Sequence, residues 1–130
     1  MLEWFTGESV RRIPLSRTAF YESGIKKIEN NELQEMYDYV NGIIDELPIQ
    51  EDGKKKFVPA WNIPTIWTDI PLKSIGKMWG YDTEESARWF GLLVMDVIIN
   101  RKGKWYAGKF NFDRPHDQTV YWTNEESITE

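Results

Sequence analysis

The clearest pattern along the chain is a run of apolar residues at helical spacing. They recur every three or four residues, which places them on one side of a helix. They are Leu33, Met36, Tyr37, Val40, Ile43, Ile44 and Leu47. Asn30 or Asn31 can cap the first turn, and Pro48 follows the last apolar position and stops the helix. The pattern therefore predicts a helix over residues 31–47 with one buried side.

A second helical pattern spans residues 72–79. Its inward positions are Leu72, Ile75, Met78 and Trp79. Pro71 stands at the first helical position, where a missing N–H is tolerated, and Gly80 ends the helix. We therefore expect a short helix followed by a glycine turn.

A third helix is expected directly after that turn. Its capping signature is either Asp82 with Glu85 or Thr83 with Ser86. The expected core stripe is Ala87, Phe90, Val94, Val97 and Ile98. Periodicity does not separate a helix from a buried strand within the continuous apolar run at 91–99. Its β-branched residues favour a strand, whereas the uninterrupted run from a good cap favours a helix. We expect a helix over residues 83–98.

Alternating patterns predict strands near both ends of the chain. Residues 104–112 and 119–123 form two of them, joined through the sequence DRPHDQ. One side of the first strand carries Trp105, Ala107 and Lys109, and the other carries Tyr106, Gly108 and Phe110. Neither side is uniformly polar, so we expect both to be covered in part. Residues 2–5 and 10–15 can pair as a hairpin around 6–9, with Pro14 at a strand end or edge.

Residues 48–71 form the least regular segment. Its four prolines and Gly53 exclude a long helix, and Asp52-Gly53 predicts a turn. The second half is rich in apolar residues, so we expect it to pack against the body and to contain a strand or a 3₁₀ turn. Together the patterns predict one α+β domain over residues 1–123, with two to four helices and an antiparallel sheet or winged-helix-like hairpin. Residues 124–130 form a polar tail.

Composition narrows the classes of function. The chain has 130 residues, of which 15% are aromatic, including seven tryptophans. This aromatic content indicates first a stable core. The absence of cysteine excludes disulfides, thiolate catalysis and zinc sites built on thiolates. No signal peptide is visible, and the longest apolar run, 89–99, is too short to span a membrane. We expect a soluble, cytoplasmic protein that does not bind membranes.

The charge of the chain is segregated. The net charge is −5, and residues 28–52 carry eight acids and no lysine or arginine. Residues 100–114 carry five basic residues and a single acid. The basic residues are Arg101, Lys102, Lys104, Lys109 and Arg114. Such faces are most often simply solvated. An acidic chain would be repelled by nucleic acid unless this basic segment alone met the phosphates.

The order of the predicted elements is that of a winged helix-turn-helix. Two helices joined by a glycine turn are followed by a basic two-strand ribbon. In its patterning, the stretch EESARWFGLLVMDVIINRKGKWYAGKF resembles the winged-helix part of plasmid and phage replication initiators. The resemblance covers less than a third of the chain and includes no diagnostic motif. It implies DNA binding, with the ribbon as a wing.

The charge of the second helix opposes DNA binding. In a helix-turn-helix protein, the first turns of the second helix meet bases and phosphates. Here those turns carry Asp82, Glu84 and Glu85, and only Arg88 is basic. Three carboxylates near phosphates oppose docking, so nucleic acid is a disfavoured partner.

The only histidine, His116, lies between Asp113 and Asp117. A catalytic histidine usually needs an orienting carboxylate together with a nucleophile or a metal. The chain has no second histidine, no cysteine, no GxSxG motif and no glycine-rich phosphate loop. We therefore expect a turn, and no catalytic residue, metal or cofactor. Arg114 and His116 can still contact an anion beside Arg101, Lys102 and Lys104.

Two tryptophans in the irregular segment are candidates for a recognition surface. Trp61 and Trp67 lie six residues apart, and exposed aromatic residues on a proline-stiffened loop make a preorganised binding hot spot. Packing against the core is the alternative, because large apolar side chains seldom stay exposed. Glu32 and Glu35 on the predicted acidic helix complete the candidate partner-binding set.

We interpret the sequence as that of a non-catalytic protein that binds, and by binding inhibits, a protein partner. Small acidic chains without cysteine or catalytic motifs are common among accessory proteins of phages and mobile elements, which is an analogy. The alternatives are a winged-helix DNA-binding protein and a small-molecule or nucleotide-binding protein with an aromatic pocket. The predicted 31–47 helix can also serve as a surface between two copies of the chain.

Overall fold

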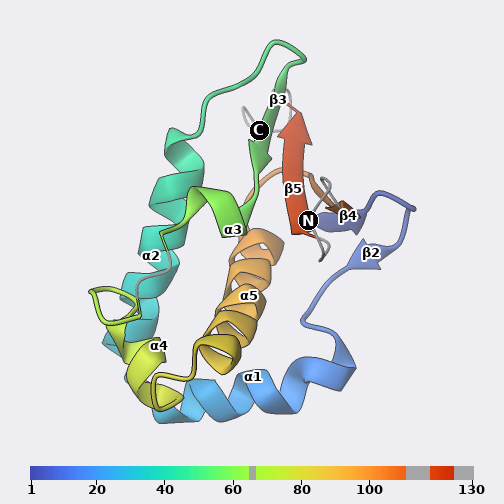
Figure 1. Cartoon of the computed structure of the whole chain (residues 1–130). Helices are drawn as coiled ribbons and strands as arrows, with labels where there is room; N and C mark the ends of the chain where they lie inside the picture. The colour runs from blue at the N-terminus through green and yellow to red at the C-terminus, as the bar shows by residue number, and fades with distance from the viewer. Residues whose placement is uncertain (65–66, 111–117, 125–130) are drawn as a thin grey trace.

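Ten helices and strands make up the chain in a computed structural model, which describes residues 1–64, 67–110 and 118–124. The strands are β1 (Leu2–Trp4), β2 (Ser9–Val10), β3 (Lys54–Phe57), β4 (Trp105–Phe110) and β5 (Gln118–Asn124). The helices are α1 (Leu15–Lys27), α2 (Asn30–Glu46), α3 (Pro59–Asn62), α4 (Lys73–Met78) and α5 (Thr83–Asn100). The fold is therefore α+β, with α1, α2 and α5 as its main helices (Figure 1).

The sheet is mixed, whereas the sequence predicted an antiparallel one. Its strand order is β2-β1-β4-β5-β3, and β1 pairs with β4 in parallel, with Leu2 opposite Trp105. Parallel strands need a crossover connection, and here all five helices lie between β1 and β4. The predicted β4–β5 hairpin forms, and it occupies the middle of the sheet with a neighbour on each side.

The predicted 31–47 helix is confirmed as α2, with a different start. Met36, Val40 and Ile44 are fully buried in the core. The cap predicted at Asn30 or Asn31 is wrong, because Glu29 holds the N-cap position without a side-chain hydrogen bond. The burial of the apolar side thus stabilises this helix without a side-chain cap.

Helix α5 confirms the helical reading of the ambiguous apolar run. Asp82 is the N-cap, and its Oδ1 accepts the Glu85 backbone N–H at 2.9 Å. The predicted stripe is wrong at Ala87, which is exposed, and it omitted Trp89 and Leu93, which are fully buried. Since α1, α2 and α4 all pack against α5, more than one side of it is buried.

Helix α1 was not predicted. The expected second strand of the N-terminal hairpin, 10–15, shortens to Ser9–Val10, and Pro14 precedes the helix instead of ending a strand. Only Tyr21 and Gly24 of α1 are buried. A glycine contributes no apolar signal, so the periodicity of this helix is weak in the sequence.

The helix-turn-helix order of α4 and α5 is confirmed at the level of local structure. Leu72 is the N-cap of α4, so Pro71 lies before the helix and not at its first position. Beyond the C-cap Trp79, the Gly80 N–H donates to the Lys77 carbonyl at 3.2 Å and the Tyr81 N–H to the Gly76 carbonyl at 2.7 Å. These two bonds form a Schellman motif, with Gly80 at a φ of 60°.

The irregular segment contains both a strand and a short helix, β3 and α3. The Asp52-Gly53 turn is confirmed: Gly53 has a φ of 77°, and Asp52 Oδ1 accepts the Lys54 N–H at 3.1 Å. Phe57 at the end of β3 is fully buried and contacts Tyr121 of β5. The segment therefore packs against the body, as its apolar content predicted.

Trp89 connects α1 to the core. Its indole Nε1 donates to the Tyr21 carbonyl at 3.0 Å, and the Tyr21 ring stacks on it with ring centroids 5.4 Å apart. Gly24, one turn further along α1, leaves room for the indole, since a Cβ there would lie 2.0 Å from Nε1. The close approach of α1 to α5 thus requires glycine at this position.

We predict that Gly24→Ala lowers the free energy of unfolding by about 1–3 kcal/mol, because the added methyl group overpacks the Trp89 contact. Gly42→Ala in α2 is the matched control. A Cβ at Gly42 meets nothing within 4 Å, so helix propensity should leave stability unchanged or raise it by up to about 1 kcal/mol. Urea unfolding measures both variants. Equal stabilities would contradict the role of Gly24.

Candidate functional site

The predicted acidic pair lies in a small hollow with lysines of the same chain. Glu32 and Glu35 line this hollow of about 240 Å³ together with Lys73 and Lys77. The Ser74 hydroxyl donates to the Glu32 carboxylate. The two acids are thus brought together, but the chain's own cations accompany them.

The two candidate tryptophans do not share a surface. Trp61 on α3 is 48% exposed, whereas Trp67 is 8% exposed and belongs to the core. Trp67 packs edge-on against Phe90 with ring centroids 5.9 Å apart, and a Cβ at Gly76 would lie 2.4 Å from its carbonyl oxygen. Trp67 therefore packs in the core, the alternative considered for both residues, and of the two only Trp61 is exposed.

Of the five basic residues predicted to meet an anion, the structure describes three, and two of these, Arg101 and Lys104, are engaged within the fold. Arg101 donates to Asn41 Oδ1 at 2.6 Å and pairs with Asp45 at 2.7 Å. Lys104 pairs with Glu3 at 3.1 Å, and Lys102 is exposed. Arg114 and His116, with the flanking Asp113 and Asp117, lie outside the described residues.

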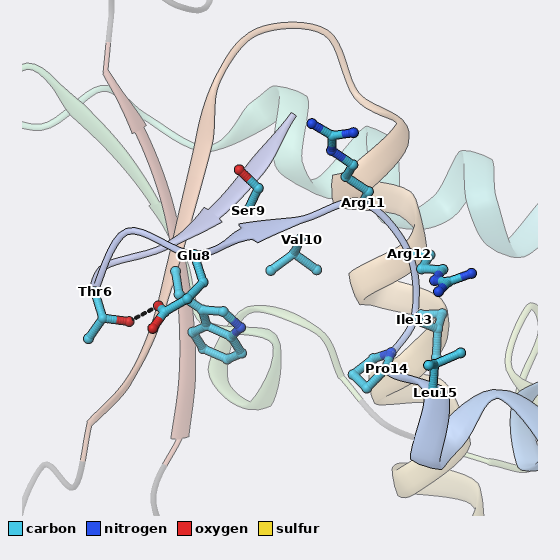
Figure 2. Close-up of a pocket in the computed structure, with 10 residues that line it drawn as sticks. Thr6, Glu8, Ser9, Val10, Arg11, Arg12, Ile13, Pro14 and Leu15 are labelled. Carbon is cyan, nitrogen blue, oxygen red and sulfur yellow. Dashed lines mark hydrogen bonds between the residues drawn. The ribbon is translucent and has the colours of Figure 1, made fainter.

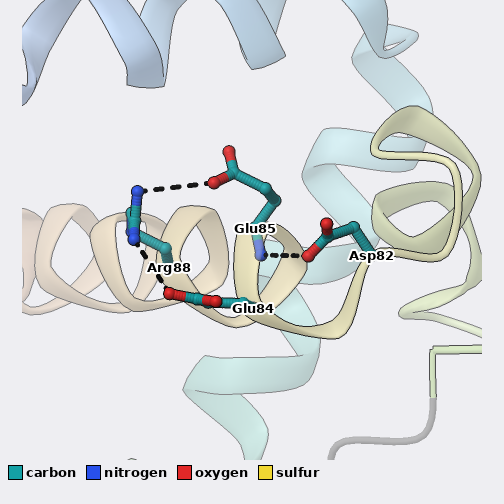
Figure 3. Close-up of polar contacts among 4 residues, drawn as sticks. All are labelled: Asp82, Glu84, Glu85 and Arg88. Carbon is teal, nitrogen blue, oxygen red and sulfur yellow. Dashed lines mark hydrogen bonds and ion pairs between the residues drawn. The ribbon is translucent and has the colours of Figure 1, made fainter.

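At the start of α5, the basic residue faces two acids. Figure 3 shows Arg88 between Glu84 and Glu85, at 3.3 Å and 3.4 Å, while Asp82 caps the helix. These side chains leave a net negative charge at the turns that would approach DNA. The carboxylates thus oppose DNA docking in the structure, as they did in the sequence.

A buried lysine at the end of α2 was not predicted. Lys55 is 7% exposed, and its Nζ donates to the carbonyls of Ile44 and Asp45 at 2.9 Å and 3.1 Å. Burial lowers the pKa of Lys55, and Asp45 opposes this shift. The Asp45 carbonyl is one that the helix end leaves without an intrahelical partner, and the Ile44 carbonyl also accepts the Leu47 N–H. The donors of Lys55 are thus mostly used within the fold.

The outer side of the sheet carries a connected aromatic cluster. Tyr106 stacks on Trp122 at 5.9 Å, Trp122 contacts Phe110 at 6.3 Å, and Phe110 contacts Phe5 at 6.1 Å. The predicted alternation had placed Tyr106 and Phe110 on one side, but it did not identify their partners, Phe5 directly after β1 and Trp122 on β5. These contacts join the three central strands of the sheet.

A wide hollow lies beside the chain that runs from β2 to α1. Its volume is about 770 Å³, and residues 9–15 line one side of it, with Trp4, Thr6 and Glu8 on the other strand and the turn. Arg11 and Arg12 extend from this connection, as Figure 2 shows. We call residues 11–15 the arginine segment. Ile13 is buried and anchors it, whereas Leu15 is 72% exposed.

The arginines of this region differ from the others in their partners. Among the described residues, Arg88 and Arg101 pair with carboxylates. Arg11, Arg12 and Arg17 have no carboxylate of the described chain within 4.0 Å. Glu8, which lines the same hollow, accepts a hydrogen bond from Thr6. The region thus presents unpaired positive charge in an acidic protein.

A second hollow, of about 380 Å³, lies on the other side of the arginine segment and reaches Tyr21 and Asp96. The Tyr21 hydroxyl donates to Asp96 Oδ2 at 2.8 Å, and the Tyr37 hydroxyl donates to the same oxygen. Burial, followed by the Asp96 hydrogen bond, raises the pKa of Tyr37 to about 12. Burial also raises the pKa of Tyr21 well above its usual value. The network links α1, α2 and α5.

Two kinds of feature are missing from the parts of the chain that the structure describes. These parts contain no group of three or more histidine, cysteine or acidic residues arranged to hold a metal ion. None of their helices is long and apolar enough to cross a lipid bilayer.

Comparisons with family models, with curated proteins and with solved structures found no match. The geometry of this chain therefore carries the functional argument. The arginine segment is the candidate site that the sequence reading missed. Its signal was two adjacent arginines directly before an Ile-Pro pair, in a stretch assigned to a hairpin.

We predict that Tyr37→Phe lowers the free energy of unfolding at neutral pH by about 1–2 kcal/mol, because it removes a hydrogen bond to a carboxylate. Tyr39→Phe in the same helix is the control, with a change near zero. The Tyr37 phenol ionises near pH 10 in the unfolded chain and near 12 in the folded one. Its contribution is therefore complete below pH 10 and is lost as the pH rises toward 12.

Thermal unfolding followed from pH 8 to pH 12 tests this sign. The wild type should lose stability more steeply between pH 10 and pH 12 than Tyr37→Phe does. Parallel curves for the two proteins would show that Tyr37 titrates normally, against the buried network.

Proposed function

We propose that the protein is a non-catalytic protein-binding domain and that the arginine segment with the hollow beside it is its recognition surface. One observation carries the proposal: the described arginines without a carboxylate partner all lie between residues 11 and 17, and two of them, Arg11 and Arg12, line the hollow of about 770 Å³. Arginine is enriched at protein interfaces and among their hot spots.

An exposed apolar side chain adjoins these charges. Leu15 lines the same hollow and is 72% exposed. Arginine beside an exposed apolar side chain fits a protein interface, because arginine is enriched there while most other charged residues are depleted from the interface core. A DNA site would instead need a wider basic surface, and the other described arginines are paired with acids.

The charge of the site selects the charge of the partner. The whole chain carries a net charge of −5, but distant exposed charges are screened beyond roughly 8 Å at physiological ionic strength. Arg11 and Arg12 therefore dominate the potential that a docking segment feels, and they favour an acidic one. Binding of this kind acts by covering the partner's acidic surface.

Photo-crosslinking tests this assignment. A photoreactive amino acid replaces Leu15, and the crosslinked proteins from a lysate of the source organism are identified by mass spectrometry. We predict that Arg11→Glu combined with Arg12→Glu removes a specific crosslink and weakens binding of the identified partner at least about tenfold, or 1.4 kcal/mol.

The matched control is Lys102→Glu combined with Lys109→Glu, which changes the net charge equally on the predicted basic segment. Glu35→Gln tests the acidic hollow. Both controls should keep the crosslink. A crosslink that survives reversal of the arginines, or that disappears with either control, would place the interface elsewhere.

A further inference from the structure

One edge of the sheet is open and lies beside the arginine segment. At the opposite edge, the chain before β3 covers the strand: Ile49 forms a bridge with Lys55, and the Gln50 N–H donates to the Lys54 carbonyl at 2.8 Å. Strand β3 also carries three consecutive lysines, which discourage pairing with another chain. The β2 edge has neither form of protection among the described residues.

The hydrogen-bond register shows which backbone groups of β2 are open. The Trp4 N–H donates to the Glu8 carbonyl at 2.8 Å, and Leu2 pairs with Val10. Hydrogen-bonded and non-hydrogen-bonded pairs alternate between antiparallel strands. Ser9, opposite Glu3, therefore points its N–H and C=O away from β1.

The backbone beyond β2 is also available. Arg11, Arg12 and Ile13 make no backbone hydrogen bond with the described residues. The chain is extended from Ser9 to Val10 and then lines the 770 Å³ hollow up to Leu15. An open strand edge thus continues directly into two unpaired guanidinium groups (Figure 2).

We propose that an extended acidic segment of a protein partner adds to β2 as a sixth strand of the sheet. This rests on the proposed function and names the mode of binding at the same site. The outward N–H and C=O of Ser9 supply main-chain hydrogen bonds, as in other cases of strand addition. Arg11 and Arg12 then pair with carboxylates of the added strand, which gives selectivity for acidic sequences.

The charges near the added strand favour this occupant over a basic one. Glu8 is the acid that lines the same hollow, and it is engaged by Thr6. Glu3, opposite Ser9, is paired with Lys104. Glu22 lines the neighbouring hollow together with Arg11 and Arg12. The two arginines outnumber this acid, so a basic peptide would meet a net like charge there.

A defined peptide probes this surface directly. The probe is a blocked, fluorescein-labelled heptapeptide of alternating glutamate and valine, with glutamate at both ends. The control peptide has lysine in place of glutamate, and a third has proline at its central position. Fluorescence anisotropy with the full chain measures the affinities. We expect saturable binding of the glutamate peptide at or below about 1 mM, and affinities at least about tenfold weaker for both other peptides.

Two proline variants separate the backbone contact from stability. Ser9→Pro removes an N–H that points away from β1, a position where an edge strand tolerates proline. Val10→Pro removes an N–H within the β1–β2 ladder and is expected to destabilise the hairpin. We predict that Ser9→Pro keeps the unfolding midpoint near that of the wild type but weakens the glutamate peptide at least about tenfold, while Ser9→Ala binds normally.

The outcomes distinguish the binding mode from the proposed function. Binding of the glutamate peptide that disappears in Ser9→Pro and in the double arginine reversal supports strand addition. No saturable binding of the glutamate peptide, or equal binding of the lysine peptide, overturns it. If a crosslinked partner depends on Arg11 and Arg12 but binds Ser9→Pro as tightly as the wild type, the recognition surface stands and strand addition is wrong.

Discussion

The contact between Tyr21 and Trp89 is the interaction on which the candidate site depends. The two rings stack, and the Trp89 indole N–H donates to the Tyr21 carbonyl. The Tyr21 hydroxyl also donates to Asp96 on the same helix as Trp89. Helix α1 fully buries only Tyr21 and Gly24, while Phe20 and Ile25 pack against the core in part. Because α1 begins at Leu15, this contact also fixes one end of the arginine segment. Strand β2 fixes the other end, and Ile13 anchors the middle.

The distribution of acidic and basic residues also favours the arginine segment as the site. Although the acids outnumber the bases, the carboxylates neutralise cations that are distant in sequence: Asp45 pairs with Arg101, and Glu3 pairs with Lys104. Exposed pairs of this kind contribute little stability. Their larger consequence here is to confine unpaired guanidinium charge to one region, where the sheet edge is also open.

Local patterns predicted those elements whose signals are local. Helix α2, helix α5 with its Asp82 cap, and the β4–β5 hairpin follow from periodicity and capping residues a few positions apart. The parallel pairing of β1 with β4 was not predictable in this way, because no local feature of Leu2 specifies a partner at Trp105. Helix α1 was missed because its closest packing position is a glycine.

The candidate site was harder to predict because contacts between distant residues decide the environment of each side chain. Trp61 and Trp67 are the same residue type in the same proline-rich segment, and contacts with Gly76 and Phe90 decide that one is core and the other exposed. Likewise, Arg11 and Arg101 look alike in sequence. Arg101 is paired because Asn41 and Asp45 come close to it in the fold, and no sequence pattern shows that Arg11 is not.

The central claim is that β2 is an open strand edge next to unpaired arginines. Residue-resolved amide hydrogen exchange of the protein alone tests it most directly, because it needs no partner. The account predicts that the Ser9 N–H exchanges at close to the rate of an unstructured peptide, while the neighbouring Val10 N–H is protected by β1. Protection of Ser9 equal to that of Val10 would show that this edge is covered, and would contradict the account.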